Sequence, residues 1–368
     1  MSGELQFGLK VSYDGKSVAS GVTANADQVK HFGETAKRAG EQASASLDRT
    51  AISAKQTAAA LREHLRVPGM GETTARYFRD KLAMRVKAHR EHLPVPQFVH
   101  VMNDEALKDF VARVPAPWIL KARSQAAAIG LKKIECEAEL WPALDALGDR
   151  RSFHLLEQFT PGDVFHVDAL VWDRDVVFTA VHRYGTPPYA VAHEGGLFTT
   201  RSVPPGGPEW EPLAALARDV VQAFGLVRGV THAEFIRAHD DGRWLFLETS
   251  ARVGGAYIVN VVEAESGLNL WREWAKIEVA GEDGHYAPTV DRPSRMAGLI
   301  LTLARQERPD TSAYTDAEIV YRVGKKNHAG LIVASDAAAR VHALLDRYAA
   351  RFREDFVATA PVPDAPPD

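Results

Sequence analysis

The chain has 368 residues, a formal net charge of −4 and one cysteine, Cys136. At ~150 residues per domain this length predicts two or three domains, and the charge shows no basic patch of the kind that binds nucleic acid. A single cysteine excludes an intrachain disulfide and a cysteine-based metal cluster, and no apolar run approaches the ~20 residues that span a bilayer. We therefore expect a cytoplasmic protein that has neither nucleic acid nor a membrane as a partner.

Residues 1–60 differ in character from the rest of the chain. Residues 5–13 alternate apolar and polar side chains, which is typical of a half-buried strand. Residues 25–65 are rich in Ala, Gln, Glu and Lys and hold few large apolar side chains, which predicts a helix that needs a partner. In composition this N-terminal stretch resembles the beginning of a phage tail tape-measure protein.

The following part of the chain is predicted to mix helices with strands. Apolar spacing and flanking Pro and Gly residues indicate helices at residues 73–91, 104–114 and 138–147 and strands at residues 97–101, 118–122 and 153–159. Lys81 lies early on the first of these helices, and Lys121 lies near the end of the strand at residues 118–122.

A loop of small residues follows Lys121 and includes Ser124, Ala128 and Gly130. Such a loop lets backbone N–H groups fold over phosphates, while nearby lysines supply positive charge. Taken singly, a lysine on a helix face is usually solvated, and a loop of small residues is usually an ordinary turn.

The second half of the chain is predicted to be richer in strands. We expect strands at residues 165–172, 176–184, 231–238, 243–249, 297–303 and 330–334, helices at residues 213–224, 257–266, 270–279 and 337–355, and a disordered tail at residues 358–368. Residues 185–208 are predicted to form a long loop. Arg183 and Arg201, in or beside this loop, are candidates for substrate contact, although loop residues are more often solvated.

His166 and Asp168 interrupt an otherwise apolar strand. Side chains alternate along a strand with period two, so both lie on one face. The pattern leaves two interpretations open, in which this face is either solvated or lines a site.

Two carboxylates, Glu234 and Glu248, lie in apolar strands that a short turn joins. If the strands pair, the carboxylates come side by side, and they then repel one another unless a cation lies between them. Magnesium prefers carboxylate and phosphate oxygens. Arg252 could reach a transferred phosphoryl group, and Gly254 and Gly255 allow close backbone approach. The alternative is a surface hairpin of alternating charge.

In order and spacing these segments resemble the ATP-grasp superfamily, in particular amino-acid ligases. The resemblance implies an α/β (α+β) fold in which two lobes, residues 61–160 and 161–280, clasp ATP. It adds a small C-terminal subdomain at residues 281–357. Residues 1–60 form an N-terminal helical extension where the family has a domain that helps to form the substrate pocket, so we expect impaired turnover.

The resemblance also assigns roles residue by residue. Lys81 and Lys121 match the lysines that contact the ATP phosphates, and Ser124, Ala128 and Gly130 belong to the flexible flap above them. Glu157 and Phe159 match the hinge that meets the adenine, and His166 matches a position near ribose or phosphate. Glu234 and Glu248 match the magnesium ligands, and Arg252 matches the arginine that steadies the phosphoryl group. Arg183, Arg201, Gly254 and Gly255 are the candidates for the substrate side.

The implied activity is ATP- and Mg²⁺-dependent ligation of a small-molecule carboxylate to an amine through an acyl phosphate, with Mn²⁺ as a substitute metal. Two alternatives stay open. One is an ATP-grasp reaction with a different acceptor, such as a carboxylase or a kinase-like enzyme, and the other is a structural, phage-related protein. The substrates and the oligomeric state, including a homodimer, are left undecided by the sequence.

Overall fold

The computed structural model describes residues 59–66, 69–125, 131–194, 196–281, 284–290 and 295–358. All of them belong to one compact unit, Ile52–Asp368. The elements predicted before residue 59 and the tail after residue 358 lie outside the described residues. Among the helices of the described part, none combines the length and the apolar character that crossing a bilayer requires.

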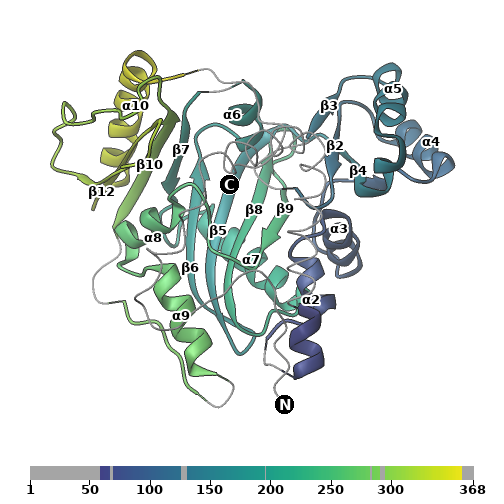
Figure 1. Cartoon of the computed structure of the whole chain (residues 1–368), viewed down its shortest axis with the longest axis horizontal. Coiled ribbons are helices and arrows are strands. Elements are labelled where there is room, and N and C mark those ends of the chain that lie inside the picture. The colour runs from purple at the N-terminus through teal and green to yellow at the C-terminus, as the bar shows by residue number, and fades with distance from the viewer. Residues whose placement is uncertain are drawn as a thin grey trace, which may run out of the picture. The chain divides into compact units, whose positions relative to one another are not determined.

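A four-stranded antiparallel sheet lies in the first part of the unit, with strand order β1-β4-β2-β3. Its elements are β1 (Phe98–His100), α4 (Asp104–Arg113), β2 (Trp118–Ala122), β3 (Lys132–Ile134), α5 (Glu137–Leu147), a 3-10 helix (Gly148–Phe153) and β4 (His154–Gln158). Helices α4 and α5 lie beside this sheet (Figure 1) and bury Leu107, Phe110, Leu140 and Leu144 with its apolar side chains. This packing gives the small sheet a core of its own.

Two helices, α2 (Glu72–Tyr77) and α3 (Lys81–Arg90), replace the single helix predicted for residues 73–91. The break comes at Asp80, whose side chain accepts hydrogen bonds from the backbone N–H groups of Leu82 and Ala83. An aspartate in this role begins a new helix, because it satisfies amides that lack a partner in the first turn. Lys81 is therefore the first residue of α3 and lies at the N-terminal end of that helix.

An eight-stranded antiparallel sheet forms the larger part of the unit, in the order β11-β12-β10-β7-β6-β5-β8-β9. Its strands are β5 (Gly162–Trp172), β6 (Asp175–Tyr184), β7 (Phe198–Ser202), β8 (Gly229–Ala238), β9 (Trp244–Ser250), β10 (Met296–Leu303), β11 (Ile319–Arg322) and β12 (His328–Ser335). Strands β10 to β12, which belong to the small C-terminal subdomain expected at residues 281–357, continue this sheet. The sheet thus offers one extended face on which distant segments meet.

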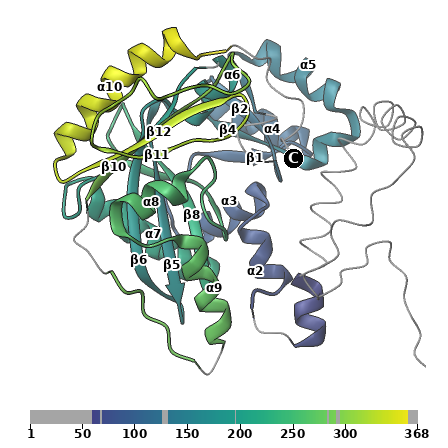
Figure 2. The ribbon, with the colours of Figure 1, turned by 60° about the vertical axis from the view of Figure 1, so that its left-hand side comes forward.

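Helices cover both faces of the large sheet. They are α7 (Trp210–Phe224), α8 (Ile258–Ser266), α9 (Leu270–Ala280) and α10 (Ala338–Asp355), and a short helix, α6 (Pro188–Glu194), precedes β7. Helix α7 packs on the face that carries Phe165 and Phe235, whereas α8 and α9 pack on the face that carries Leu170 and Val230. Figure 2 shows α10 lying along β10 and β12, where its apolar side chains join a further core.

The long loop predicted for residues 185–208 is wrong as stated. Helix α6 and strand β7 lie within it. Strand β7 is short and polar in pattern, with the sequence FTTRS, so it has no apolar periodicity of its own. Its backbone pairs with β6 on one side and β10 on the other. Tertiary pairing, rather than local preference, makes it a strand.

Candidate active site

Glu234 and Glu248 stand directly opposite one another on β8 and β9. On the other side of β8, Glu234 is paired with His166 of β5, and His166 is in turn paired with His182 of β6. Directly opposed residues in an antiparallel sheet project from the same face. A row of polar side chains therefore crosses four strands on the face covered by α8.

The lysine at the start of α3 reaches this row. The Lys81 Nζ lies 2.7 Å from Oε2 of Glu248 and also donates to the backbone carbonyl of Gln125 at 2.8 Å. Burial opposes the ionised form of Glu248, but the ammonium groups of Lys81 and Lys121 and the guanidinium of Arg85 lower its pKa to about 2. Glu248 is thus a carboxylate at neutral pH, surrounded by positive charge.

Lys121 is largely buried and forms an ion pair with Glu157. Its Nζ lies 2.7 Å from Oε2 of Glu157, a side chain that is 1% exposed. Arg85, 0% exposed, donates to Oε1 of the same carboxylate at 2.7 Å. Burial disfavours the charged form of Glu157, yet the two cations hold its pKa below the usual range. This buried triad links α3 to β2 and β4.

Glu157→Gln should lower the free energy of unfolding by about 3–5 kcal/mol, because it leaves the buried charges of Arg85 and Lys121 without their shared counter-ion. Urea denaturation measures the loss. Glu135→Gln is the matched control, since the ion pair of Glu135 with Lys133 is exposed and contributes about 0–1 kcal/mol. Equal losses in the two variants would contradict a structural role for the triad.

Glu234 is surrounded by different partners. The Tyr184 hydroxyl donates to its Oε1 at 2.9 Å, and the His232 Nε2 lies 3.8 Å from the same oxygen. The His232 Nδ1 lies 2.9 Å from Asp168. Burial disfavours the charged imidazole, but the carboxylates of Asp168 and Glu234 raise the pKa of His232 to about 10. Glu234 therefore faces a hydroxyl donor and an imidazolium.

His166 and Asp168 are both fully buried, so the solvated face that the sequence left open does not apply. The Nδ1 of His166 bonds to Asp168 at 2.7 Å, its Nε2 lies 2.8 Å from the Thr200 hydroxyl, and burial lowers the pKa of His166 to about 3. Every polar atom of the His166 ring therefore has a partner within the protein.

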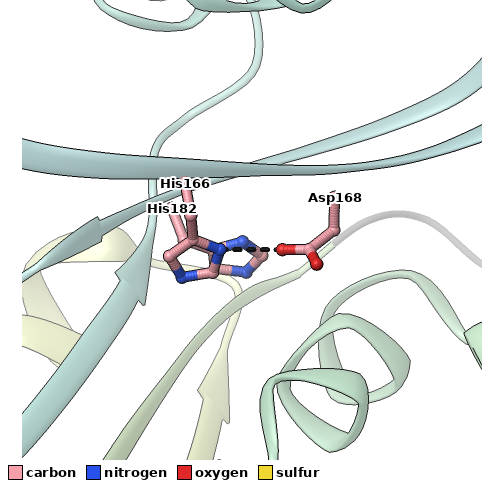
Figure 3. A group of neighbouring side chains, drawn as sticks. All are labelled: His166, Asp168 and His182. Atoms are coloured by element: carbon pink, nitrogen blue, oxygen red, sulfur yellow. Dashed lines mark hydrogen bonds and ion pairs between the residues drawn. The ribbon is translucent and has the colours of Figure 1, made fainter. Parts of the chain in front are cut away.

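His166, Asp168 and His182 form a compact group of side chains with metal-ligand chemistry (Figure 3). The rings of His166 and His182 stack, with 4.8 Å between centroids and an angle of 11° between planes. Imidazole lone pairs lie in the ring plane, so those of two parallel rings do not converge on one ion. The hydrogen bonds of His166 also use both of its nitrogens. We interpret the group as a structural network rather than a metal centre.

Glycine is required where the chain turns past Asp168. A Cβ built at Gly254 would lie 2.9 Å from Asp168 Oδ1 and 2.8 Å from a methyl carbon of Ile258, closer than side chains pack. Gly255, in contrast, has open space at the corresponding position. The close backbone approach that was expected of both glycines is therefore found at Gly254, where the chain packs against Asp168 and α8.

The other residues predicted for the nucleotide site lie just after strands of the two sheets or outside the described part of the chain. Arg252 follows β9 and donates to the carbonyl of Val253 at 2.7 Å, Ser124 follows β2, and the ring of Phe159, just after β4, lies 4.7 Å from the ammonium of Lys133. Ala128 and Gly130 lie outside the described residues.

The two arginines expected at the substrate are not brought to the polar face. Arg183 and Arg201 are paired across β6 and β7, one residue out of step with His182, and therefore project from the opposite face. Arg183 lies over the Phe165 ring and pairs with Asp163 at 2.8 Å. The sequence could not assign Arg201 to a face of the sheet, because strand β7 was not predicted.

Comparison with known proteins agrees with this architecture. No family model matches the chain. It is 26% identical over 226 residues to an L-arginine-specific L-amino acid ligase of Bacillus subtilis, which covers 60% of this chain and 54% of that protein. The chain thus spans about half the length of this curated relative.

Two solved structures share the fold over most of their length. An L-amino acid ligase from Bacillus licheniformis matches with a TM-score of 0.62 and 18% identity, over 82% of this chain and 77% of that one. N5-carboxyaminoimidazole ribonucleotide synthetase from Thermus thermophilus matches with a TM-score of 0.64 and 20% identity, over 83% and 80%. The chain has the ATP-grasp fold.

The candidate site residues come from both sheets of this fold. Lys121 and Glu157 come from the small sheet, and Glu234 and Glu248 come from the large one. Lys81 of α3 contacts both sides, because its Nζ lies 2.7 Å from Glu248 of the large sheet and 2.8 Å from the backbone carbonyl of Gln125, which follows β2 of the small sheet. The sequence analysis missed three residues that contact predicted site residues. Arg85 of α3 contacts Glu157, and Tyr184 of β6 and His232 of β8 both contact Glu234. A local signal existed only for His232, which precedes Glu234 by two positions on the same strand.

Proposed function

We propose that the protein is an ATP- and magnesium-dependent ligase that joins a carboxylate to an amine through an acyl phosphate. The single observation that carries this proposal is the pairing of Glu234 with Glu248 across β8 and β9, with Lys81 at 2.7 Å from Glu248. Two opposed carboxylates with basic residues beside them suit a metal–phosphate complex, because the metal satisfies the acids and the phosphates satisfy the lysine.

The donor set at this position fits magnesium. Glu234 and Glu248 offer hard oxygen ligands, and Glu248 is ionised at neutral pH because its pKa is held at about 2 by neighbouring positive charge despite burial. Bound magnesium would offset the negative charge of the phosphates. Mn²⁺ has the same ligand preference and should substitute for it.

The chain's own residues would act by positioning and by charge. Lys81 and Lys121 would hold the phosphates, and Arg252 would steady the phosphoryl group as it moves. A carboxylate oxygen of the substrate attacks the terminal phosphorus, and ADP leaves. The amine then attacks the acyl carbon, phosphate leaves, and the amine gives up its proton. Phosphoryl transfer of this kind depends on alignment and electrostatics, so no nucleophilic side chain is needed.

The substrates are proposed to be amino acids. The Bacillus subtilis relative is by name a ligase of L-amino acids, and the structural relative from Bacillus licheniformis is named likewise. The fold alone also suits another acceptor, since a carboxyaminoimidazole ribonucleotide synthetase has a comparable TM-score. Product identity therefore distinguishes between the ligase and these alternatives.

Mg-ATP should raise the melting temperature of the full chain. A ligand present at 100 times its Kd stabilises the native state by about 2.7 kcal/mol, which corresponds to a shift of several degrees for a protein of this size. Thermal unfolding with and without millimolar Mg-ATP measures the shift, with Mg-GTP as the comparison nucleotide. An unchanged melting temperature would mean that the site does not bind ATP.

An ADP-release screen over pairs of amino acids tests the reaction itself. We expect ADP release to depend on both an acid and an amine, with an amide product that mass spectrometry detects in the same amount as ADP. Release stimulated by bicarbonate alone, or phosphate ester formation, would instead assign the protein to another ATP-grasp reaction. Mg-ATP binding without any acceptor-dependent release would leave the ligase proposal without support.

A further inference from the structure

Glu234 differs from Glu248 in how the protein holds it. Glu248 contacts a flexible lysine, and its side chain is 32% exposed. Glu234 is 19% exposed and meets two rigid aromatic side chains, the Tyr184 phenol and the His232 imidazole. Rings with two side-chain torsions lose little conformational entropy when they are fixed, whereas a lysine loses much. The two carboxylates therefore differ in the stiffness of their partners.

Tyr184 reaches Glu234 from beyond the intervening strand. It belongs to β6, Glu234 belongs to β8, and β5 lies between them. The Tyr184 ring is 4% exposed and packs at 4.8 Å, centroid to centroid, on the ring of His166. That contact fixes the ring, and its hydroxyl then has Glu234 Oε1 as an acceptor at 2.9 Å. The hydroxyl selects one oxygen and one orientation of the carboxylate.

His232 is fixed from behind by Asp168. The Nδ1–H of His232 donates to Asp168 Oδ1 at 2.9 Å, and this bond turns Nε2 toward Glu234 Oε1, 3.8 Å away. Asp168 is itself held by His166 and by the close passage of Gly254. The orientation of Glu234 Oε1 therefore depends on residues of three strands, although none of them needs to touch a ligand.

We propose that Tyr184 and the Asp168–His232 pair are positioning residues that fix the Glu234 carboxylate for a divalent metal bound with the nucleotide. Because Oε1 accepts from Tyr184 and faces His232 Nε2 at 3.8 Å, Oε2 would be the oxygen that a metal takes. Partners of this kind, which orient a ligand without binding the metal, typically account for about 10- to 100-fold in metal affinity. The inference rests on the proposed function, since it assumes that Glu234 is a metal ligand.

The test is the affinity of the full chain for Mn²⁺ in the presence of ADP, measured from the electron paramagnetic resonance signal of free Mn²⁺. Tyr184→Phe removes only the hydroxyl and should raise the Kd for Mn²⁺ about tenfold. Tyr286→Phe is the matched control, because the Tyr286 hydroxyl donates to the buried Glu273 at 3.0 Å, away from the site. Both variants should lose similar thermal stability, and only the first should lose metal affinity.

A double-mutant cycle separates positioning from general disruption. In a Glu234→Gln background, Tyr184→Phe should change the Kd by less than about twofold, because the carboxylate that the hydroxyl orients is already gone. His232→Asn supplies a second variant, should Tyr184→Phe fold poorly, and it should show the same dependence on Glu234.

The possible outcomes are distinct. If Tyr184→Phe and His232→Asn bind Mn²⁺ as the parent does, or if Tyr286→Phe loses as much affinity as Tyr184→Phe, the positioning role is overturned while the proposed function stands. Additive losses in the cycle overturn it as well. If the parent chain binds no Mn²⁺ with ADP, the proposed function fails first, and this inference fails with it.

Discussion

Glu248→Gln should lower kcat/KM for ligation by about 10²–10³-fold, the range seen when one electrostatic partner of a transition state is removed. The amide keeps the size of the side chain and removes its charge, so the metal loses an anionic ligand. Raising the magnesium concentration should restore part of the activity, because mass action compensates for a weaker site. Initial rates of ADP release across a magnesium titration measure both effects.

The fold should persist in this variant. The Lys81–Glu248 pair is partly exposed, and pairs of that kind contribute about 0–1 kcal/mol to stability. Glu318→Gln is a suitable control, since it breaks the surface pair with Arg340 and should leave the magnesium dependence alone. Parental activity in Glu248→Gln would remove this carboxylate from the metal site.

Lys121→Met should weaken the binding of Mg-ATP about 10- to 100-fold. A hydrogen bond to a charged group contributes roughly 1.5–3 kcal/mol, and ~1.4 kcal/mol corresponds to a tenfold change in Kd. Isothermal titration calorimetry with a non-hydrolysable ATP analogue measures the loss on folded protein. The variant must be shown to be folded, because Lys121 also pairs with the buried Glu157 and its loss affects stability.

A lysine of purely structural importance would behave differently. Its replacement by methionine would lower the melting temperature and leave the affinity of the folded protein for Mg-ATP unchanged. Lys87→Met gives the comparison, since Lys87 pairs with Glu91 at the surface of α3 and should affect neither quantity strongly. Unchanged affinity in Lys121→Met would assign this lysine to the buried triad alone.

The sequence predicted elements well where apolar residues set the pattern. The strand at residues 118–122 is β2 as predicted, and the helix at residues 104–114 differs from α4 by one residue. The prediction failed where a single side chain or pairing with a distant strand determines the secondary structure. Asp80 divides a continuous helical pattern because it caps α3, and β7 is a strand because β6 and β10 pair with it.

For the site, the sequence could predict partners that lie on neighbouring strands. Glu234 and Glu248 are 14 positions apart and joined by a short turn, so their pairing follows from the hairpin. Arg85 and Glu157, in contrast, are 72 positions apart, and Tyr184 and Glu234 are 50 apart. Such contacts depend on how whole sheets and helices pack, and no local pattern in a single sequence carries that information.

The Lys81–Glu248 ion pair makes the lysine an internal counter-ion, and this affects how ligands compete. A divalent cation that approaches Glu248 alone must displace the ammonium, and a phosphate that approaches Lys81 alone must displace the carboxylate. A metal–phosphate complex replaces both halves of the pair at once, so neither charge is left uncompensated. If the proposed site binds both ligands, the pair would couple them thermodynamically, and each would raise the affinity for the other by the same factor.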